Sequence, residues 1–310
     1  MIQQSVGVIG VGRLGSDVAL TLAERDLCDV VLYDKDVDRA HFLASDLSDT
    51  SFGHVYNSRI TSVSRMEDLS RCDVILLAAG ARMEPGVSTE EVFEKNEDLI
   101  SEIADAFVGS SPLFVVASEP IDLMTAALRR RLRIPASRVL GIAGVVDSFR
   151  LRHALGSALE VGPDYIAGHL IGPSTSDAHI IWEFTSINGI AAREVAGPSV
   201  IAGVDKQFAQ ESEARLKRLT ESFSRYAPAA AAFDLLRAIV KDDRRIITVT
   251  MEWTNILGIS DVAMSVPAVI GRLGADRVEL PTLDAGTVGK LQASAEHLKS
   301  ILTKHVEQEA

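Results

Sequence analysis

The sequence predicts an α/β protein in which a doubly wound parallel sheet precedes a second domain of mixed α and β structure. Short apolar runs alternate with stretches of helical apolar spacing through the first half of the 310 residues, as strands and helices do around a parallel sheet. A glycine-rich turn follows the first apolar run directly. In the second half strands become sparse and long charged helical segments appear, so we expect domains at 1–146 and 147–310.

The first strand–turn–helix–strand unit carries the most specific signal. The apolar run 6–9 leads into G-V-G-R-L-G at 10–15, and a second apolar run at 30–33 ends at Asp34. This is the context of the G-x-G-x-x-G motif in Rossmann-type dinucleotide-binding units, in which the glycines permit a tight turn, close approach of a pyrophosphate and helix packing. Asp34 is placed to accept hydrogen bonds from ribose hydroxyls and repels a 2′-phosphate, so we expect NAD rather than NADP.

The remaining elements follow from apolar periodicity. The expected elements are, in order, a helix at 40–47, strands at 58–63 and 73–78, a turn-rich segment at 80–88, a helix at 90–107, strands at 113–116 and 165–171, a charged helix at 207–226, a strand at 246–251 and a C-terminal helix with Leu291, Ala295, Leu298 and Leu302 on one face. Ligands of such sheets bind at the carboxyl ends of the strands. The residues expected to contact the cofactor there are Gly10, Gly12, Arg13, Leu14, Gly15, Asp34, Ala79, Gly80, Ala81 and Ser118.

Composition excludes several classes of partner. The net charge of −12 disfavours nucleic acid and anionic membranes. The longest apolar stretch, at 74–79, is far shorter than the ~20 residues of a membrane-spanning helix, and the early glycine motif leaves no room for a signal peptide. Cys28 and Cys72 have no metal-binding or redox spacing, so we expect a cytoplasmic protein with no metal site.

Several segments in order resemble the L-lactate/malate dehydrogenase family. They are the glycine motif with L-Y-D at 32–34, A-S-D-L at 44–47, A-G-A-R at 79–82, P-I-D-L-M-T at 120–125, R-V-L-G at 138–141, D-S-F-R at 147–150, V-P-A-V-I-G at 266–271 and S-A-E-H-L at 294–298. The resemblance covers almost the whole chain. It implies a homodimer or homotetramer that reduces 2-oxo acids with NADH.

The resemblance also implies four polar side chains at the reacting centre. In the family a histidine donates the proton and an aspartate orients it, while one arginine binds the substrate carboxylate and a loop arginine polarises the carbonyl. Asp147 and Arg150 match the aspartate and the carboxylate-binding arginine, and their three-residue spacing places both on one face of a helix.

The other two catalytic positions depart from the family pattern. Ser174 stands where the family has histidine, and Thr89 stands where it has the loop arginine. The strand-end asparagine is replaced by Glu119. The loop position that selects among oxo acids is Met83, or Arg82 if the alignment shifts by one. Ser224 lies in the stretch that lines the family's substrate pocket and can offer a hydroxyl to the substrate.

These departures suggest altered acid–base chemistry, because serine cannot replace histidine as a proton donor near neutral pH. Glu119 and Asp147 would give a pocket with two carboxylates and one arginine, suited to an amine or iminium carbon beside a carboxylate, or able to raise one carboxyl pKa. Alternatively, Glu119 pairs with a basic residue and does no chemistry.

We expect an NAD-dependent oxidoreductase that acts on a small carboxylate, a 2-oxo or 2-hydroxy acid or its imine or amino analogue. One alternative is a catalytically silent NAD(H)-binding sensor or partner protein. Another is a conventional dehydrogenase in which His169 or His179 has moved into the site.

Overall fold

The computed structural model describes residues 4–81, 86–174, 177–218 and 225–306. One nine-stranded sheet runs through the molecule. Its strands, from one edge to the other, are β14 (Gly274–Arg277), β13 (Ala263–Gly271), β12 (Arg245–Glu252), β6 (Val139–Gly141), β5 (Leu113–Val116), β4 (Val74–Leu77), β1 (Ser5–Ile9), β2 (Asp29–Tyr33) and β3 (Ile60–Ser62). The six strands from β3 to β6 are parallel, and β12, β13 and β14 continue the sheet in antiparallel pairing. The predicted doubly wound fold with a second α/β unit is confirmed.

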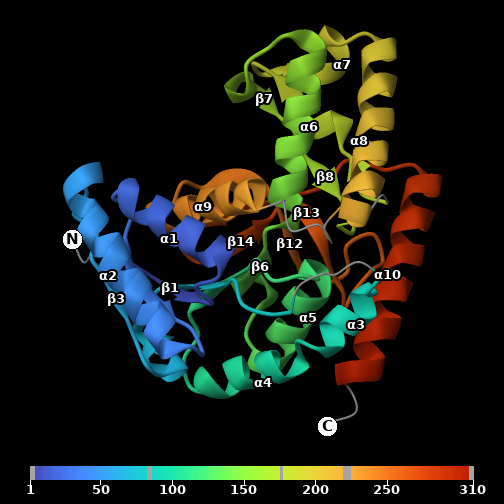
Figure 1. Cartoon of the computed structure of the whole chain (residues 1–310). Coiled ribbons are helices and arrows are strands. Elements are labelled where there is room, and N and C mark those ends of the chain that lie inside the picture. The colour runs from blue at the N-terminus through green and yellow to red at the C-terminus, as the bar shows by residue number, and fades with distance from the viewer. Residues whose placement is uncertain (1–3, 82–85, 175–176, 219–224, 307–310) are drawn as a thin grey trace.

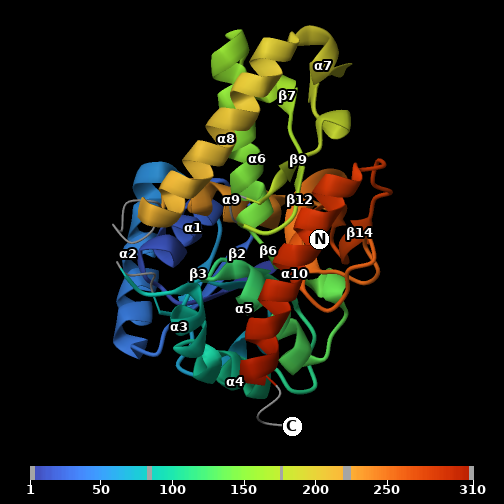
Figure 2. The same ribbon diagram turned by 90° about the vertical axis from the view of Figure 1, so that its right-hand side faces the viewer.

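Helices cover both faces of this sheet (Figure 1). On one face lie α1 (Arg13–Glu24), α2 (Val37–His54), α6 (Ala143–Leu159) and α9 (Tyr226–Lys241). On the other lie η1 (Met66–Arg71), α3 (Thr89–Glu94), α4 (Glu97–Ala106), α5 (Ile121–Leu132) and α10 (Ala285–Val306), with α10 running beside α5 (Figure 2). The short η2 (Ala136–Arg138) precedes β6.

Strand alternation divides the core between the two faces. Val74 and Leu76 of β4 pack under α1 and α9, whereas Ile75 and Leu77 pack against the α4 and α5 side. A one-residue slip in register would exchange these two sets and leave both faces mispacked. The parallel strands are therefore apolar on both faces, as the continuous hydrophobic run at 74–77 predicts.

A smaller lobe projects from one end of the sheet, carried by α6 (Figure 1). Its elements are η3 (Pro163–Tyr165), β7 (Ile166–Ala167), β8 (Leu170–Ile171), β9 (His179–Ile180), η4 (Trp182–Phe184), β10 (Ser186–Ile187), β11 (Ile190–Ala191), α7 (Ala192–Val195) and α8 (Pro198–Arg218). Leu151 and Leu155 of α6 pack with Trp182 and Phe208 to form a separate core here.

Three expected elements differ from the structure. The helix expected at 90–107 is interrupted at Lys95 and Asn96, because the Asn96 side chain binds two loops instead of facing solvent. The strand expected at 165–171 is divided into β7, which pairs with β10, and β8, which pairs with β9. The helix expected at 207–226 begins earlier, at Pro198, and Tyr226 opens α9 instead.

The C-terminal helix is as predicted, with Leu291, Ala295, Leu298 and Leu302 buried. Cys28 and Cys72 are free and buried. Within the described ranges, no helix is long and apolar enough to span a bilayer, and no three side chains form a metal-binding group.

Candidate active site

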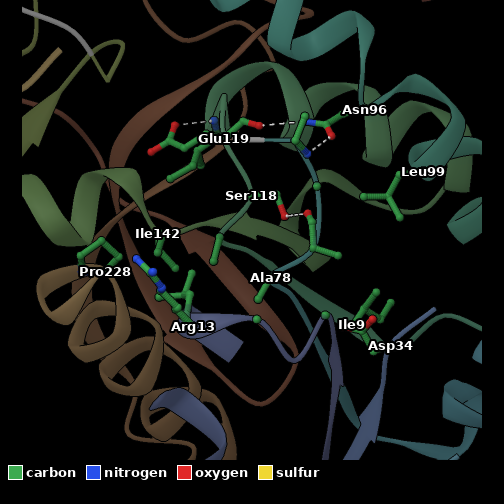
Figure 3. Close-up of a pocket in the computed structure, with 18 of the residues that line it drawn as sticks. Ile9, Arg13, Asp34, Ala78, Asn96, Leu99, Ser118, Glu119, Ile142 and Pro228 are labelled. Carbon is green, nitrogen blue, oxygen red and sulfur yellow. Dashed lines mark hydrogen bonds between the residues drawn. The ribbon is translucent and has the colours of Figure 1, made fainter. Parts of the chain in front are cut away.

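A cavity of about 710 Å³ opens at the carboxyl ends of β1, β4, β5 and β6 (Figure 3). It extends from Asp34 at one end to Arg150 and Ser174 at the other. Many of the residues expected to bind a cofactor or substrate line it: Gly10, Gly12, Arg13, Leu14, Asp34, Ala79, Gly80, Ala81, Ser118, Glu119, Arg150 and Ser174. The topology thus brings together segments that are far apart in the sequence.

The glycine-rich turn forms one wall, and two of its glycines are sterically required. Gly10 has a φ of 93°, and a Cβ there would lie 2.7 Å from the backbone of Ala79. A Cβ on Gly15 would lie 2.0 Å from the carbonyl oxygen of Gly10. No side chain caps the N-terminus of α1, which begins directly after Gly12. The first N–H groups of this helix therefore suit an anion such as the pyrophosphate of a dinucleotide.

Substituting Gly15 with alanine tests this close packing. Because the added methyl group must displace backbone, we expect strain of about 1–3 kcal/mol at the turn and roughly tenfold or more weaker NADH binding. Gly53 is the matched control, since a Cβ there meets nothing within 4 Å. NADH fluorescence titration measures both variants, and equal affinities would contradict the role of Gly15.

Asp34 is held rigidly at the far end of the cavity. Its carboxylate accepts hydrogen bonds from the backbone N–H groups of Val11 at 2.9 Å and of Asp36 at 3.0 Å. The bond from Val11 connects the end of β2 to the glycine-rich turn, and the bond from Asp36 connects it to the start of α2. Lys35 and Arg39 also line this end, although no pattern in the sequence pointed to them.

Asn96, likewise not anticipated, connects the loops after β4 and β5. It is buried, with its amide oxygen accepting from the N–H of Ala81 at 2.7 Å and its amide nitrogen donating to the carbonyl of Glu119 at 3.0 Å (Figure 3). Gly80, at φ 138°, approaches Asn96 so closely that a Cβ would lie 2.9 Å from the amide oxygen. Ser118 adds a hydrogen bond to the carbonyl of Ala79. These contacts fix the middle of the cavity wall.

Asp147 and Arg150 form an ion pair at the opposite end. Nη1 of Arg150 donates to Oδ1 of Asp147 at 2.7 Å, across one turn of α6, as the spacing predicts. Asp147 is 3% exposed, and Arg150 lines the cavity. Asp147 thus orients the guanidinium, whose fork-shaped donor set suits a carboxylate.

Ser174 is bound through its backbone to a buried acid, Asp122. The N–H of Ser174 donates to Oδ2 of Asp122 at 2.8 Å, and the Thr250 hydroxyl donates to Oδ1 at 3.3 Å. Burial, reinforced by the nearby carboxylates of Glu119 and Asp147, raises the pKa of Asp122 from 3.8 to about 7. In the sequence Asp122 stands within the segment 120–125, and its position in the first turn of a helix at a strand end was the available signal.

The raised pKa of Asp122 makes stability depend on pH. The folded protein binds this proton more tightly than the unfolded chain, so the stabilisation is complete below about pH 4 and is lost as the pH rises through about 7. The difference between the ordinary and the raised pKa of Asp122 corresponds to about 4 kcal/mol in the free energy of unfolding. We expect the free energy of unfolding of the wild type to fall over this window and that of Asp122→Asn to change less. Urea unfolding at several pH values measures this, and equal pH slopes for the two proteins would contradict it.

Neither candidate histidine lines the cavity. Nδ1 of His169 lies 3.2 Å from the Thr248 hydroxyl, and burial lowers the pKa of His169 to about 4. Burial also lowers the pKa of His179, in β9. Burial thus disfavours the imidazolium form, which is the proton donor, and neither histidine lines the cavity, so the geometry does not favour a relocated catalytic histidine.

Other predicted positions fall away from this cavity or outside the described ranges. Thr89 is the first residue of α3, whose N-cap Ser88 forms a capping box with Glu91, and it is not among the described residues of the lining. Arg82, Met83 and Ser224 lie outside the described residues. Arg225, at the N-cap of α9, does line the cavity and forms an ion pair with Asp17 at 3.1 Å.

A parallel sheet in the strand order of β3 to β6, with a glycine-rich turn and an acid at the end of β2, defines a dinucleotide-binding protein. Residues 4–141 match the lactate/malate dehydrogenase NAD-binding domain, and residues 145–309 match the lactate/malate dehydrogenase alpha/beta C-terminal domain. The chain belongs to the lactate/malate dehydrogenase family, and NAD is its cofactor.

Curated relatives and solved structures agree with this assignment. The chain is 27% identical over 282 residues to the malate dehydrogenase of Staphylococcus carnosus (strain TM300), covering 90% of this chain and 91% of that protein. It is 29% identical over 293 residues to the malate dehydrogenase of Chlorobium luteolum (strain DSM 273 / BCRC 81028 / 2530), covering 94% of each. The malate dehydrogenase structure from Cryptosporidium parvum superposes with a TM-score of 0.89 at 24% identity, over 99% of this chain and 100% of that one.

The lactate dehydrogenase structure from Cryptosporidium parvum, complexed with lactic acid and nicotinamide adenine dinucleotide, also has a TM-score of 0.89. Its identity is 21%, over 100% of this chain and 99% of that one. At this identity the likeness establishes the shared fold.

Proposed function

We propose that this protein is an NAD-dependent oxidoreductase that acts on a small carboxylate by non-standard acid–base residues. The substrate's carboxylate is bound by Arg150, and its neighbouring carbon carries an oxo, hydroxyl, imine or amino group. The bound cofactor supplies or accepts the hydride at that carbon.

The observation that carries the proposal is the position of Arg150. Its guanidinium lines the same cavity as the glycine-rich turn and is oriented by the buried Asp147. A single cavity therefore offers a dinucleotide site at one end and a bidentate carboxylate donor at the other.

The acid–base part of the proposal rests on what surrounds Arg150. Ser174 and Glu119 line the cavity, and Asp147 lies behind it. The carboxylates of Glu119 and Asp147 can stabilise a substrate whose reacting atom is a protonated nitrogen. An imine or amino acid thus fits this end of the cavity, beside the oxo and hydroxy acids. Because the relatives are named malate dehydrogenase, oxaloacetate belongs in the substrate panel.

A silent NAD(H)-binding sensor or partner protein is the second candidate. It is favoured by the replacement of the family's proton donor and loop arginine with Ser174 and Thr89. Such a protein would bind NADH and a carboxylate without turnover.

Initial rates of NADH oxidation distinguish the two. The panel contains small 2-oxo acids, including pyruvate and oxaloacetate, each with and without ammonium or a simple amine. Oxidation above the rate without protein supports the oxidoreductase, and dependence on amine supports imine reduction. Absence of oxidation, with NADH binding confirmed by fluorescence, supports the silent protein.

We also propose a homodimer or homotetramer located in the cytoplasm. Phe42 and Phe52 of α2 expose 69% and 92% of their surface, an apolar area that a second copy can cover. The two free, buried cysteines support a reducing compartment. Sedimentation of the wild type and of Phe52→Ser tests the assembly, since a monomeric wild type would contradict it.

A further inference from the structure

Asp122 is a buried acid that lies behind the residues lining the active-site cavity. It lies in the first turn of α5, is only 7% exposed, and accepts a hydrogen bond from the backbone N–H of Ser174. The resemblance described above places Ser174 where the family has its proton-donating histidine. Asp122 does not itself line the cavity, whereas Glu119, three residues earlier, does. The Glu119 carboxylate turns back to accept the N–H of Ile121 at 3.4 Å, at the start of the same helix (Figure 3).

The groups that face Asp122 come from four parts of the chain. The turn before α5 contributes the Glu119 carboxylate, and α6 contributes Asp147, which is paired with Arg150. Strand β12 contributes the Thr250 hydroxyl, which lies 3.2 Å from the hydroxyl of Ser265 in β13, and the loop after β8 contributes the Ser174 N–H. The charged groups near Asp122 are thus mostly carboxylates, and its hydrogen-bond donors are neutral.

Carboxylates grouped in this way cannot all be ionised without a large cost in free energy. Burial is the largest cause that raises the pKa of Asp122, to about 7; the Glu119 and Asp147 charges add to it, while the Ser174 N–H and the Thr250 hydroxyl act in the opposite direction. Asp122 is therefore about half protonated at neutral pH, when ordinary aspartates have lost their proton.

We propose that Asp122 and Glu119 share this retained proton, and that Glu119 delivers it to the substrate in place of the missing histidine. This inference rests on the proposed function, because it needs a substrate bound beside Arg150. Glu119 is the catalytic residue of the pair, since it lines the cavity. Asp122 is the positioning residue that keeps the proton available and holds the Ser174 backbone.

The proton balance is complete without a further co-reactant. In the reductive direction the substrate carbon accepts a hydride, with its two electrons, and its double bond to oxygen or nitrogen becomes single. The carbonyl oxygen, or the nitrogen of a neutral imine, takes one proton from Glu119, which leaves the pair with one additional negative charge. An iminium nitrogen already carries this proton and takes none. The pair regains a proton from solvent through the open cavity, and the oxidative direction reverses each transfer.

The retained proton is tested directly by infrared spectroscopy of the whole protein, without turnover. We expect a protonated-carboxyl band that disappears as the pH rises through about 7, and its absence from Asp122→Asn. Asp105→Asn is the matched control, an exposed aspartate of α4 outside the cavity, and it should keep the band. If Asp122→Asn retains the same titrating band, the proposal is overturned.

Thr250→Val gives an independent test should Asp122→Asn fail to fold. Valine matches threonine in shape but lacks the hydroxyl that favours the Asp122 carboxylate, so the titration should move to higher pH. If the protonated-carboxyl band of Thr250→Val titrates with the same midpoint pH as that of the wild type, Asp122 is not the titrating group.

Kinetics test the delivery step separately. The pH profile of kcat should lose its limb near pH 7 in Asp122→Asn, and Glu119→Gln should lower kcat by about 10²–10⁴ with little change in KM. A Glu119→Gln variant with full kcat would overturn delivery by Glu119. If the infrared band of the wild type titrates as expected but no substrate is turned over, the proposed function and proton delivery by Glu119 both fail. If the wild type shows no titrating band, proton retention by Asp122 is overturned, whether or not a substrate is turned over.

Discussion

Replacing Arg150 with glutamine is expected to lower kcat/KM for the carboxylate substrate by about 10²–10³ while the dissociation constant for NADH stays unchanged. The guanidinium is the group that we expect to bind the substrate carboxylate, and removing one partner of a buried charge pair costs about 2–5 kcal/mol. Glutamine keeps a hydrogen-bond donor at position 150 for the buried Asp147 carboxylate. Steady-state kinetics and NADH fluorescence titration give the two constants separately.

Arg152 provides the matched control for this substitution. It lies on the same helix, two residues further on, but its side chain donates to the carbonyl of Pro163 and lines a different pocket. Arg152→Gln should leave kcat/KM unchanged. If Arg150→Gln weakens substrate binding and NADH binding equally, Arg150 does not bind the substrate carboxylate specifically.

In the Glu119→Gln variant, which lacks the proposed acid, replacing Ser174 with histidine is expected to raise the rate of 2-oxo-acid reduction by about 10²–10⁴, the usual contribution of a positioned acid. The backbone of residue 174 is already fixed by Asp122 and lines the cavity. Asp147, the residue that resembles the family's orienting aspartate, lies close enough to Asp122 to raise its pKa. A histidine at this position would therefore have a carboxylate nearby to orient it.

Ser157→His in the same Glu119→Gln variant serves as the control, because Ser157 is an exposed residue of α6 away from the dinucleotide site. Rates with pyruvate and oxaloacetate are compared at pH values on both sides of the histidine pKa. If Ser174→His gains no activity above Ser157→His, then the surroundings of residue 174 do not support the family's proton donor.

Local sequence patterns predicted the parts of the fold that local physics determines. The apolar run at 74–77 forms a central strand of the sheet. The glycine-rich turn precedes a helix whose first N–H groups are not capped by a side chain. Asp147 and Arg150 form an ion pair across one turn of a helix. Each of these depends on residues within a few positions of one another, where periodicity and backbone geometry are informative.

The contacts that the sequence did not reveal join distant segments. Asp122 meets Ser174 across 52 positions and Thr250 across 128, and its raised pKa depends on burial that only the folded sheet creates. Asn96 was expected inside one helix, but its amide joins the loops after β4 and β5. Tertiary contacts overrode the local preference in both cases, and both residues lie beside the candidate active site.

Transfer of deuterium from NADH labelled at the reactive carbon of the nicotinamide tests the central claim most directly. The protein is incubated with the labelled cofactor and a pool of small 2-oxo acids, with and without ammonium, and the products are analysed by mass spectrometry. We predict deuterium at the carbon next to the carboxylate, in a hydroxy acid or, where ammonium is required, in an amino acid, and labelling that is slower by about 10²–10³ with Arg150→Gln. Unlabelled acids in every incubation, with NADH binding confirmed in the same samples, would contradict the oxidoreductase and leave a protein that binds NADH without using it.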